Sequence, residues 1–145
     1  MSDVLNYQSD CIFCRIIRGE IPSTKVYEDT LCYAFRDIEP AAPTHILIVP
    51  KAHIASAAEI GRQNSALVAH IYEVAAKLAE QEGLTGGWRV VTNVGADAGQ
   101  TVMHLHFHRW AASCWGPWHN IKCCGSSGRR AGSPEGCCAF LPLFS

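Results

Sequence analysis

Apolar residues recur with a helical period in one long segment of the chain. Four of them stand at i, i+4, i+7 and i+11, which places them on one face of a helix. They are Leu67, Ile71, Val74 and Leu78. Asn64 is available as an N-cap residue and Gly83 as the residue that ends the helix. The pattern predicts one long amphipathic helix between residues 64 and 83.

The other patterned segments are short. Residues 11–18 are compatible with a short helix that Gly19 and Pro22 would end. Five further segments have the alternating or apolar pattern of strands. These segments are 25–28, 31–37, 45–49, 88–92 and 102–108. A short turn joins the first two and a glycine-rich turn joins the last two, so we expect an α+β fold: a small antiparallel sheet with one long and one short helix.

Length and composition indicate one ordinary globular domain. The chain has 145 residues, 48% of them hydrophobic and 17% charged, with a net charge of −1. This charge balance provides no basic surface for nucleic acid, and the longest apolar run, 46–50, is too short to cross a bilayer. The first ten residues lack the features of a signal peptide. We therefore expect a soluble, cytoplasmic protein that binds neither nucleic acid nor membranes.

The composition changes after residue 108. Residues 1–108 carry eight Lys or Arg and twelve Asp or Glu, whereas residues 109–145 carry four and one. The second segment also holds five of the eight cysteines and three of the four tryptophans. We predict an N-terminal extension over 1–10, a folded domain over 11–108 and an atypical tail over 109–145.

Three histidines alternate along the last predicted strand. His104, His106 and His108 would share one face at intervals of about 6.6 Å, with apolar side chains on the other face. The preceding loop is rich in glycine, which lets backbone N–H groups approach an anion, and Asn93 and Thr101 add side-chain donors. A phosphate-binding loop followed by three imidazoles is typical of phosphoryl or nucleotidyl transfer. The alternative is a merely polar strand or a histidine-rich metal trap.

Cys11 and Cys14 form a CxxC motif near the N-terminus. Alone, this motif is a redox pair, half of a zinc site or a coincidence. No second CxxC follows at the spacing of a zinc ribbon, so a metal would need ligands from elsewhere in the chain.

Four segments together resemble the histidine triad (HIT) nucleotide-binding proteins. They are residues 11–22, 34–38, 43–53 and 99–108, in the order and spacing of that family. The similarity is closest to the short branch that acts on nucleoside phosphoramidates. It implies a HIT-like nucleotide-binding domain over 11–108 that binds a purine nucleotide such as AMP or GMP. It also implies hydrolysis of a P–N or related bond at the α-phosphorus, and a homodimer if the C-terminus is like that of the family.

The resemblance also implies roles for individual residues. His106 would be the nucleophile that forms a nucleotidyl-histidine intermediate, with its other ring nitrogen held by the backbone carbonyl of His104. His45 and His108 would donate hydrogen bonds to the phosphate. The remaining substrate contacts would be Asn93, Gly99 and Thr101 at the phosphate, Asp37 at the ribose hydroxyls and Ile38 at the base. Without the resemblance, Asp37 would be a turn residue and Ile38 a core residue.

The resemblance further implies a structural Zn²⁺ and no organic cofactor. Its ligands would be Cys11, Cys14, His53 and His104, a closed tetrahedral set. Two other functions stay open. A catalytically weak nucleotide-sensing or scaffolding module would bind nucleotide without turnover, and a zinc-binding structural module would hold metal without being stabilised by AMP.

The resemblance stops at His108. The family continues with an apolar pair, two glycines and a basic residue, but this chain continues Arg-Trp-Ala-Ala-Ser. Residues 109–118 can be encoded so that one added T in codon 109 yields Leu-Leu-Gly-Gly-Lys-Leu-Leu-Gly-Pro-Met. Our hypothesis is that the chain is translated out of frame from Arg109 onward. The alternative is a divergent, disordered C-terminus.

Overall fold

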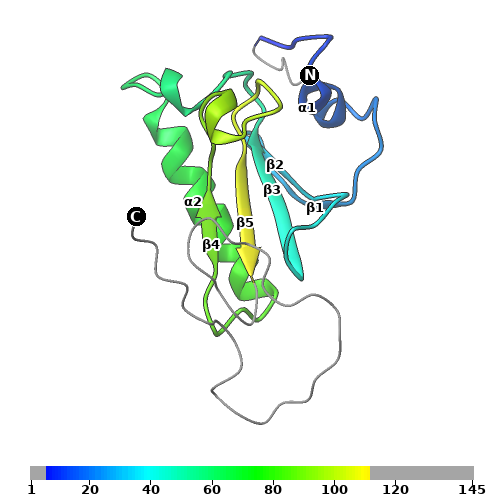
Figure 1. Ribbon diagram of the computed structural model, residues 1–145, viewed down its shortest axis with the longest axis vertical. Coiled ribbons are helices and arrows are strands. Elements are labelled where there is room, and N and C mark those ends of the chain that lie inside the picture. Colours follow the sequence, from blue (N-terminus) through cyan, green and yellow to red (C-terminus); the bar gives the residue numbers. More distant parts are fainter. Residues whose placement is uncertain (1–5, 112–145) are drawn as a thin grey trace, which may run out of the picture.

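The computed structural model describes residues 6–111, which form an antiparallel sheet of five strands and two α-helices (Figure 1). The elements are α1 (Ile12–Ile17), β1 (Lys25–Glu28), β2 (Cys32–Arg36), β3 (Thr44–Pro50), η1 (Ala57–Glu59), α2 (Ser65–Gln81), β4 (Arg89–Val91), η2 (Ala96–Ala98) and β5 (Phe107–Ala111). The predicted α+β class, with one long and one short helix, is confirmed. None of the helices within this segment is both long and apolar enough to cross a membrane.

The strands lie in the order β1-β2-β3-β5-β4, so β3 and β5 are central. Side chains of β3 alternate between the two faces. Ile46 and Ile48 belong to a core cluster with α2, whereas Leu47 and Val49 belong to a second cluster with Phe13 and Ile16 of α1. Each face of the sheet therefore has its own helix, and Figure 1 shows α1 and α2 on opposite sides.

Helix α2 begins and ends where the sequence predicts, with one difference at its start. Asn64 is the N-cap residue, but its side chain makes no capping hydrogen bond. Its Oδ1 accepts from the N–H of Gly61, and its amide donates to the carbonyl of Glu59. At the other end, Gly83 has a φ of 66°, the left-handed conformation that favours glycine after a helix.

Asp29 ties the turn between β1 and β2 to α2. Its Oδ1 accepts the N–H groups of Leu31 and Cys32, both at 2.8 Å. Its Oδ2 accepts from the hydroxyl of Tyr27 at 2.9 Å and from Nε2 of His70 on α2 at 2.6 Å. One carboxylate thus accepts hydrogen bonds from two N–H groups of the turn and also links the turn to α2.

The last strand differs from its prediction at both ends. Residues 102–106 are not part of the ladder, because this segment bonds to the loop after β3 instead: the N–H of Leu105 donates to the carbonyl of Ile54 at 2.6 Å. The strand then continues past His108 to Ala111, paired with β3 and β4. Residues 109–111 of the predicted tail therefore belong to the sheet, and residues 112–145 lie outside the described part of the chain.

Candidate active site and metal centre

The three histidines of the 104–108 segment lie on the α1 side of the sheet. Leu105 and Phe107 point into the core under α2. On the opposite side, the ring of Phe13 makes edge contacts with His104 and His106 at centroid distances of 5.9 and 5.1 Å. The predicted alternation of faces is therefore present, although only Phe107 and His108 of this segment are in a strand.

His106 has the hydrogen bond that fixes its tautomer. Its Nδ1 lies 2.7 Å from the carbonyl oxygen of His104, and a carbonyl can only accept, so Nδ1 carries the proton. The lone pair is therefore on Nε2. Burial lowers the pKa of His106, which favours this neutral form. A neutral imidazole with a defined lone pair is the form that acts as a nucleophile.

A second chain of hydrogen bonds fixes the tautomers of His45 and His108. The N–H of Ala41 donates to Nδ1 of His45 at 3.1 Å, so neutral His45 carries its proton on Nε2. This Nε2 lies 2.9 Å from Nδ1 of His108, which must accept. Burial lowers the pKa of both histidines, that of His108 to about 4. Neutral His108 is left with its N–H on Nε2, as a donor beside His106, whose ring centroid is 4.9 Å away.

Asp37 follows β2 and approaches the same histidines. Its Oδ2 lies 3.5 Å from Nε2 of His45, and its Oδ1 accepts the N–H of Glu39 at 2.9 Å. It is thus a turn residue as well as a neighbour of the imidazoles. Ile38 is 88% exposed, which excludes core packing for this side chain.

The glycine loop is organised differently from the prediction. Gly95 and Gly99 have positive φ values of 81° and 87°. However, the N–H of Gly99 donates to the carbonyl of Ala96, and that of Gly95 donates to Oε1 of Gln100. Both amides are used within the loop because the tight η2 turn brings acceptors to them. Of the other predicted phosphate contacts, Asn93 is partly exposed after β4 and Thr101 is exposed after Gln100.

Gln100 is a residue that the sequence analysis missed. It is 4% exposed, and its amide donates to the carbonyls of Ala55 and Val102 at 2.8 and 3.0 Å. Together with its contact to Gly95, these bonds join both ends of the glycine loop to the loop after β3. A buried glutamine between Gly99 and Thr101 is therefore the residue that holds the loop in place.

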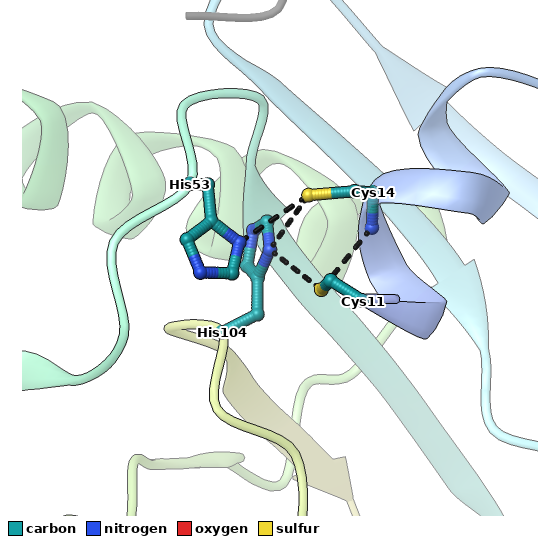
Figure 2. Close-up of side chains that lie close together, drawn as sticks. All are labelled: Cys11, Cys14, His53 and His104. Atoms are coloured by element: carbon teal, nitrogen blue, oxygen red, sulfur yellow. Dashed lines mark hydrogen bonds between the residues drawn. The ribbon is translucent and has the colours of Figure 1, made fainter. Parts of the chain in front are cut away.

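A second cluster contains the four predicted zinc ligands (Figure 2). Cys11 and Cys14 come from the start of α1, His53 from the loop after β3, and His104 from the segment before β5. Sulfur-to-Nδ1 distances are 3.4 Å for Cys11 to His104, 3.6 Å for Cys14 to His104 and 3.3 Å for Cys14 to His53. All four donor atoms lie within 4.8 Å of one another.

This donor set fits a tetrahedral metal ion. Bonds of about 2.3 Å to sulfur and about 2.0 Å to nitrogen would place neighbouring sulfur and nitrogen ligands about 3.5 Å apart. Nε2 of His104 donates to the carbonyl of Pro50 at 2.9 Å, so the lone pair of its neutral ring is on Nδ1, toward the sulfurs. Burial lowers the pKa of His104 to about 4 and raises that of Cys14 to about 11. The imidazole is thus ready to bind a cation, whereas the thiol would release its proton to solvent as a cation binds.

Comparison with known proteins identifies the family. The family model described as "Scavenger mRNA decapping enzyme C-term binding" matches residues 10–123. An uncharacterized HIT-like protein of Synechococcus elongatus is 52% identical over 99 residues, which cover 68% of this chain and 87% of that protein. The chain belongs to the histidine triad family.

Other histidine triad relatives agree with this assignment. The purine nucleoside phosphoramidase of Escherichia coli is 44% identical over 109 residues, covering 74% of this chain and 92% of that enzyme. The solved structure of a HIT family hydrolase from Clostridium thermocellum has a TM-score of 0.74 at 47% identity and covers 76% of this chain and 96% of its own. A histidine triad protein from Clostridium difficile has the same TM-score and identity, with 77% and 97% covered.

Proposed function

We propose that this histidine triad protein is a nucleotide-binding hydrolase that cleaves the P–N bond of a purine nucleoside phosphoramidate. The observation that carries the proposal is the tautomer of His106, whose Nδ1–H is held by the His104 carbonyl at 2.7 Å. The similarity to a purine nucleoside phosphoramidase supports the choice of substrate.

In the first step, Nε2 of His106 attacks the α-phosphorus. An N–P bond to histidine forms, the P–N bond to the leaving group breaks, and the amine leaves with a proton from solvent. Nε2–H of His108 donates a hydrogen bond to a phosphoryl oxygen, where negative charge develops. Because the His45 N–H holds Nδ1 of His108, this donor stays in place during the step.

In the second step, water hydrolyses the nucleotidyl-histidine. A water oxygen bonds to phosphorus, the bond to His106 breaks, and the water proton passes to solvent. The net reaction adds water across the P–N bond. Two easier displacements replace one in which free water would be a poor nucleophile.

The rest of the proposed site binds the nucleotide. Asp37 would accept the ribose hydroxyls, and exposed Ile38 would contact the base of AMP or GMP. Thr101 and Asn93 would donate to the phosphate, near the loop that Gln100 holds. Gly99 would contribute its backbone conformation rather than a hydrogen bond, because its N–H already donates to the carbonyl of Ala96.

We also propose that Cys11, Cys14, His53 and His104 hold a structural Zn²⁺. The ion would tie α1 to the segment that carries His106, and it would supply no reacting group.

The substitution His106→Ala tests the proposed nucleophile. We expect it to abolish amine release from adenosine phosphoramidate while AMP binding stays measurable, because the ring supplies the attacking nitrogen. His70→Gln, on the far side of the sheet, is the matched control and should retain turnover. Undiminished turnover by His106→Ala would eliminate the assigned role.

A second candidate, a nucleotide-sensing module, is favoured by one observation. The ring of Trp110 contacts the rings of both His45 and His108, at centroid distances of 5.4 Å each. A large ring beside the proposed phosphate donors would restrict a bulky leaving group. Tight AMP binding without turnover by the unaltered chain would support this candidate over the hydrolase.

A further inference from the structure

The three cysteines of the described segment differ in their accessibility to small molecules from solvent. Cys11 is partly exposed and lines a surface pocket of about 360 Å³ with His53 and Met103. Cys14 is fully buried, and its sulfur lies within 4.8 Å of the Cys11 sulfur. Cys32 is also fully buried, but it belongs to the core under α2. A small oxidant that enters the pocket therefore meets Cys11 first and finds Cys14 next to it.

We propose that, when no zinc is bound to the four ligands, Cys11 and Cys14 form a peroxide-oxidisable dithiol that closes into a disulfide and disturbs His106 through His104. The two residues stand at the N-cap and the third position of α1, and the N–H of Cys14 donates to the Cys11 sulfur at 3.5 Å. Their sulfurs lie within 4.8 Å of each other, and the bond of a disulfide is about 2.05 Å long. Closure therefore brings the two sulfurs together by about 3 Å at most.

Hydrogen peroxide is the oxidant, and the reaction has two steps. The Cys11 sulfur attacks one peroxide oxygen, the O–O bond breaks, and the other oxygen leaves as water with the thiol proton. The Cys14 sulfur then attacks the sulfur of the sulfenic acid, the S–O bond breaks, and a second water leaves with the Cys14 proton. Two thiols are oxidised to one disulfide, and one peroxide is reduced to two waters.

The contacts of His104 connect this reaction to His106. Both sulfurs lie against Nδ1 of His104, at 3.4 and 3.6 Å, and a disulfide would withdraw them. The backbone carbonyl of His104 is the acceptor for Nδ1–H of His106. Phe13, between the two cysteines in α1, packs against both histidine rings. Movement at the start of α1 therefore reaches His106 by two routes.

Peptide mapping of the full chain tests the dithiol directly. Trypsin cleavage after Arg15 places Cys11 and Cys14 in one peptide, residues 1–15, and Cys32 in another, residues 26–36. After chelator treatment, reduction and one equivalent of peroxide, we expect peptide 1–15 to lose two hydrogen atoms and resist alkylation, and dithiothreitol to reverse this. Cys32 should stay alkylatable. Overturning results would be full alkylation of peptide 1–15, its cross-linking to another peptide, or earlier oxidation of Cys32.

Single variants test the order of events. In Cys14→Ser, we expect dimedone to capture a sulfenic acid at Cys11, because the neighbouring Cys14 thiol that would resolve it has been removed. In Cys11→Ser, Cys14 should give no adduct at the same peroxide dose. Cys32→Ser is the matched control and should close peptide 1–15 as the unaltered chain does. Capture at Cys14 rather than at Cys11 would overturn the proposed order.

The effect on His106 rests on the proposed function and is measured separately. Closure should lower phosphoramidate turnover about tenfold, the loss typical of disturbed groups that orient an active site. Reduction should restore it, and Cys14→Ser should be insensitive to peroxide. Unchanged turnover after complete closure would overturn the connection to His106. A reduced chain without any turnover would contradict the proposed function, whereas the peptide map would still decide the dithiol.

Discussion

Nη2 of Arg109 donates to Oε2 of Glu82 over 3.1 Å, and the Arg109 side chain is fully buried. Nε and Nη1 of the same guanidinium are buried without a hydrogen-bond partner, as is Nε1 of Trp110. Within residues 6–111, these are all the side-chain nitrogen and oxygen atoms in that condition. Within the described segment, the buried side-chain groups without a partner thus belong to Arg109 and Trp110, the first two residues after His108.

Replacing Arg109 by leucine should stabilise the protein. In β5, position 109 has the same parity as Leu105 and Phe107, which pack under α2. Glu82 keeps its ion pair with Arg36, so removing the Arg109 guanidinium leaves no unpaired carboxylate. Exchanging its buried, unpaired nitrogens for an apolar side chain should therefore raise the free energy of unfolding by about 1 to 3 kcal/mol. Urea denaturation measures the change. Arg36→Leu, at the other oxygen of Glu82 and 47% exposed, is the control and should shift stability by about 1 kcal/mol at most. A less stable Arg109→Leu would show that the ion pair is net favourable.

The out-of-frame hypothesis makes a prediction about the transcript. Sequencing across codon 108 should reveal one additional nucleotide, which changes Arg109 and Trp110 to a pair of leucines followed by two glycines. A tryptic digest of the protein isolated from its source should then lack the peptide of residues 110–122. An unaltered reading together with that peptide would refute the hypothesis and establish the tail as genuine.

Zinc binding should protect the two cysteines of α1. With Zn²⁺ bound, peptide 1–15 should resist alkylation, and a chelator should expose both thiols. Protein stability should rise by about 2.7 kcal/mol when free zinc is 100 times Kd. Cys14→Ser should lose this stabilisation, whereas Cys32→Ser should keep it. Equal alkylation of peptide 1–15 with and without zinc would contradict the site.

Asp29→Asn should remove a stabilisation that depends on pH. Burial acts to raise the pKa of Asp29, but hydrogen bonds from the backbone of Cys32 and Leu31 and from His70 and Tyr27 outweigh it and lower the pKa. A lowered folded-state pKa gives stability that is present above the unfolded value, about 3.9, and is lost as pH falls toward the folded value.

We therefore expect Asp29→Asn to cost about 1 to 3 kcal/mol at pH 7, and the difference from the unaltered chain to shrink below about pH 4. Urea denaturation at a series of pH values measures both. The exposed Asp97 provides the control, because Asp97→Asn should stay within about 0.5 kcal/mol throughout. A difference that does not change with pH would show that the charge of Asp29 is not the cause.

Sequence patterns predicted the fold because hydrophobic period and burial coincide in this chain. Ile71, Val74 and Leu78 have helical spacing and are all buried in α2. The alternation around His106 predicted which side chains share a face. It did not predict where the strand begins, because residues before Phe107 bond to the loop that contains Ile54, a contact with no local signal.

The details of the candidate site depend on contacts between distant segments. The tautomers of His45 and His108 follow from the N–H of Ala41, which no residue spacing reveals. The glycine loop illustrates the same limit: its composition suggested open backbone donors, but a buried Gln100 and the η2 turn satisfy them. His104 is the exception: the resemblance predicted that its ring lies beside Cys11, Cys14 and His53 and that its carbonyl accepts from His106, and the structure has both contacts.

The position of β5 between β3 and β4 has a consequence for chains altered at this point. A central strand receives main-chain hydrogen bonds from two neighbours, and these bonds are the same for any side chain except proline. The backbone can thus complete its ladder through residue 111 whichever residues other than proline follow His108. If the out-of-frame hypothesis holds, the altered sequence keeps the main-chain hydrogen bonds of the sheet and leaves its trace in the buried, unpaired side-chain atoms of Arg109 and Trp110.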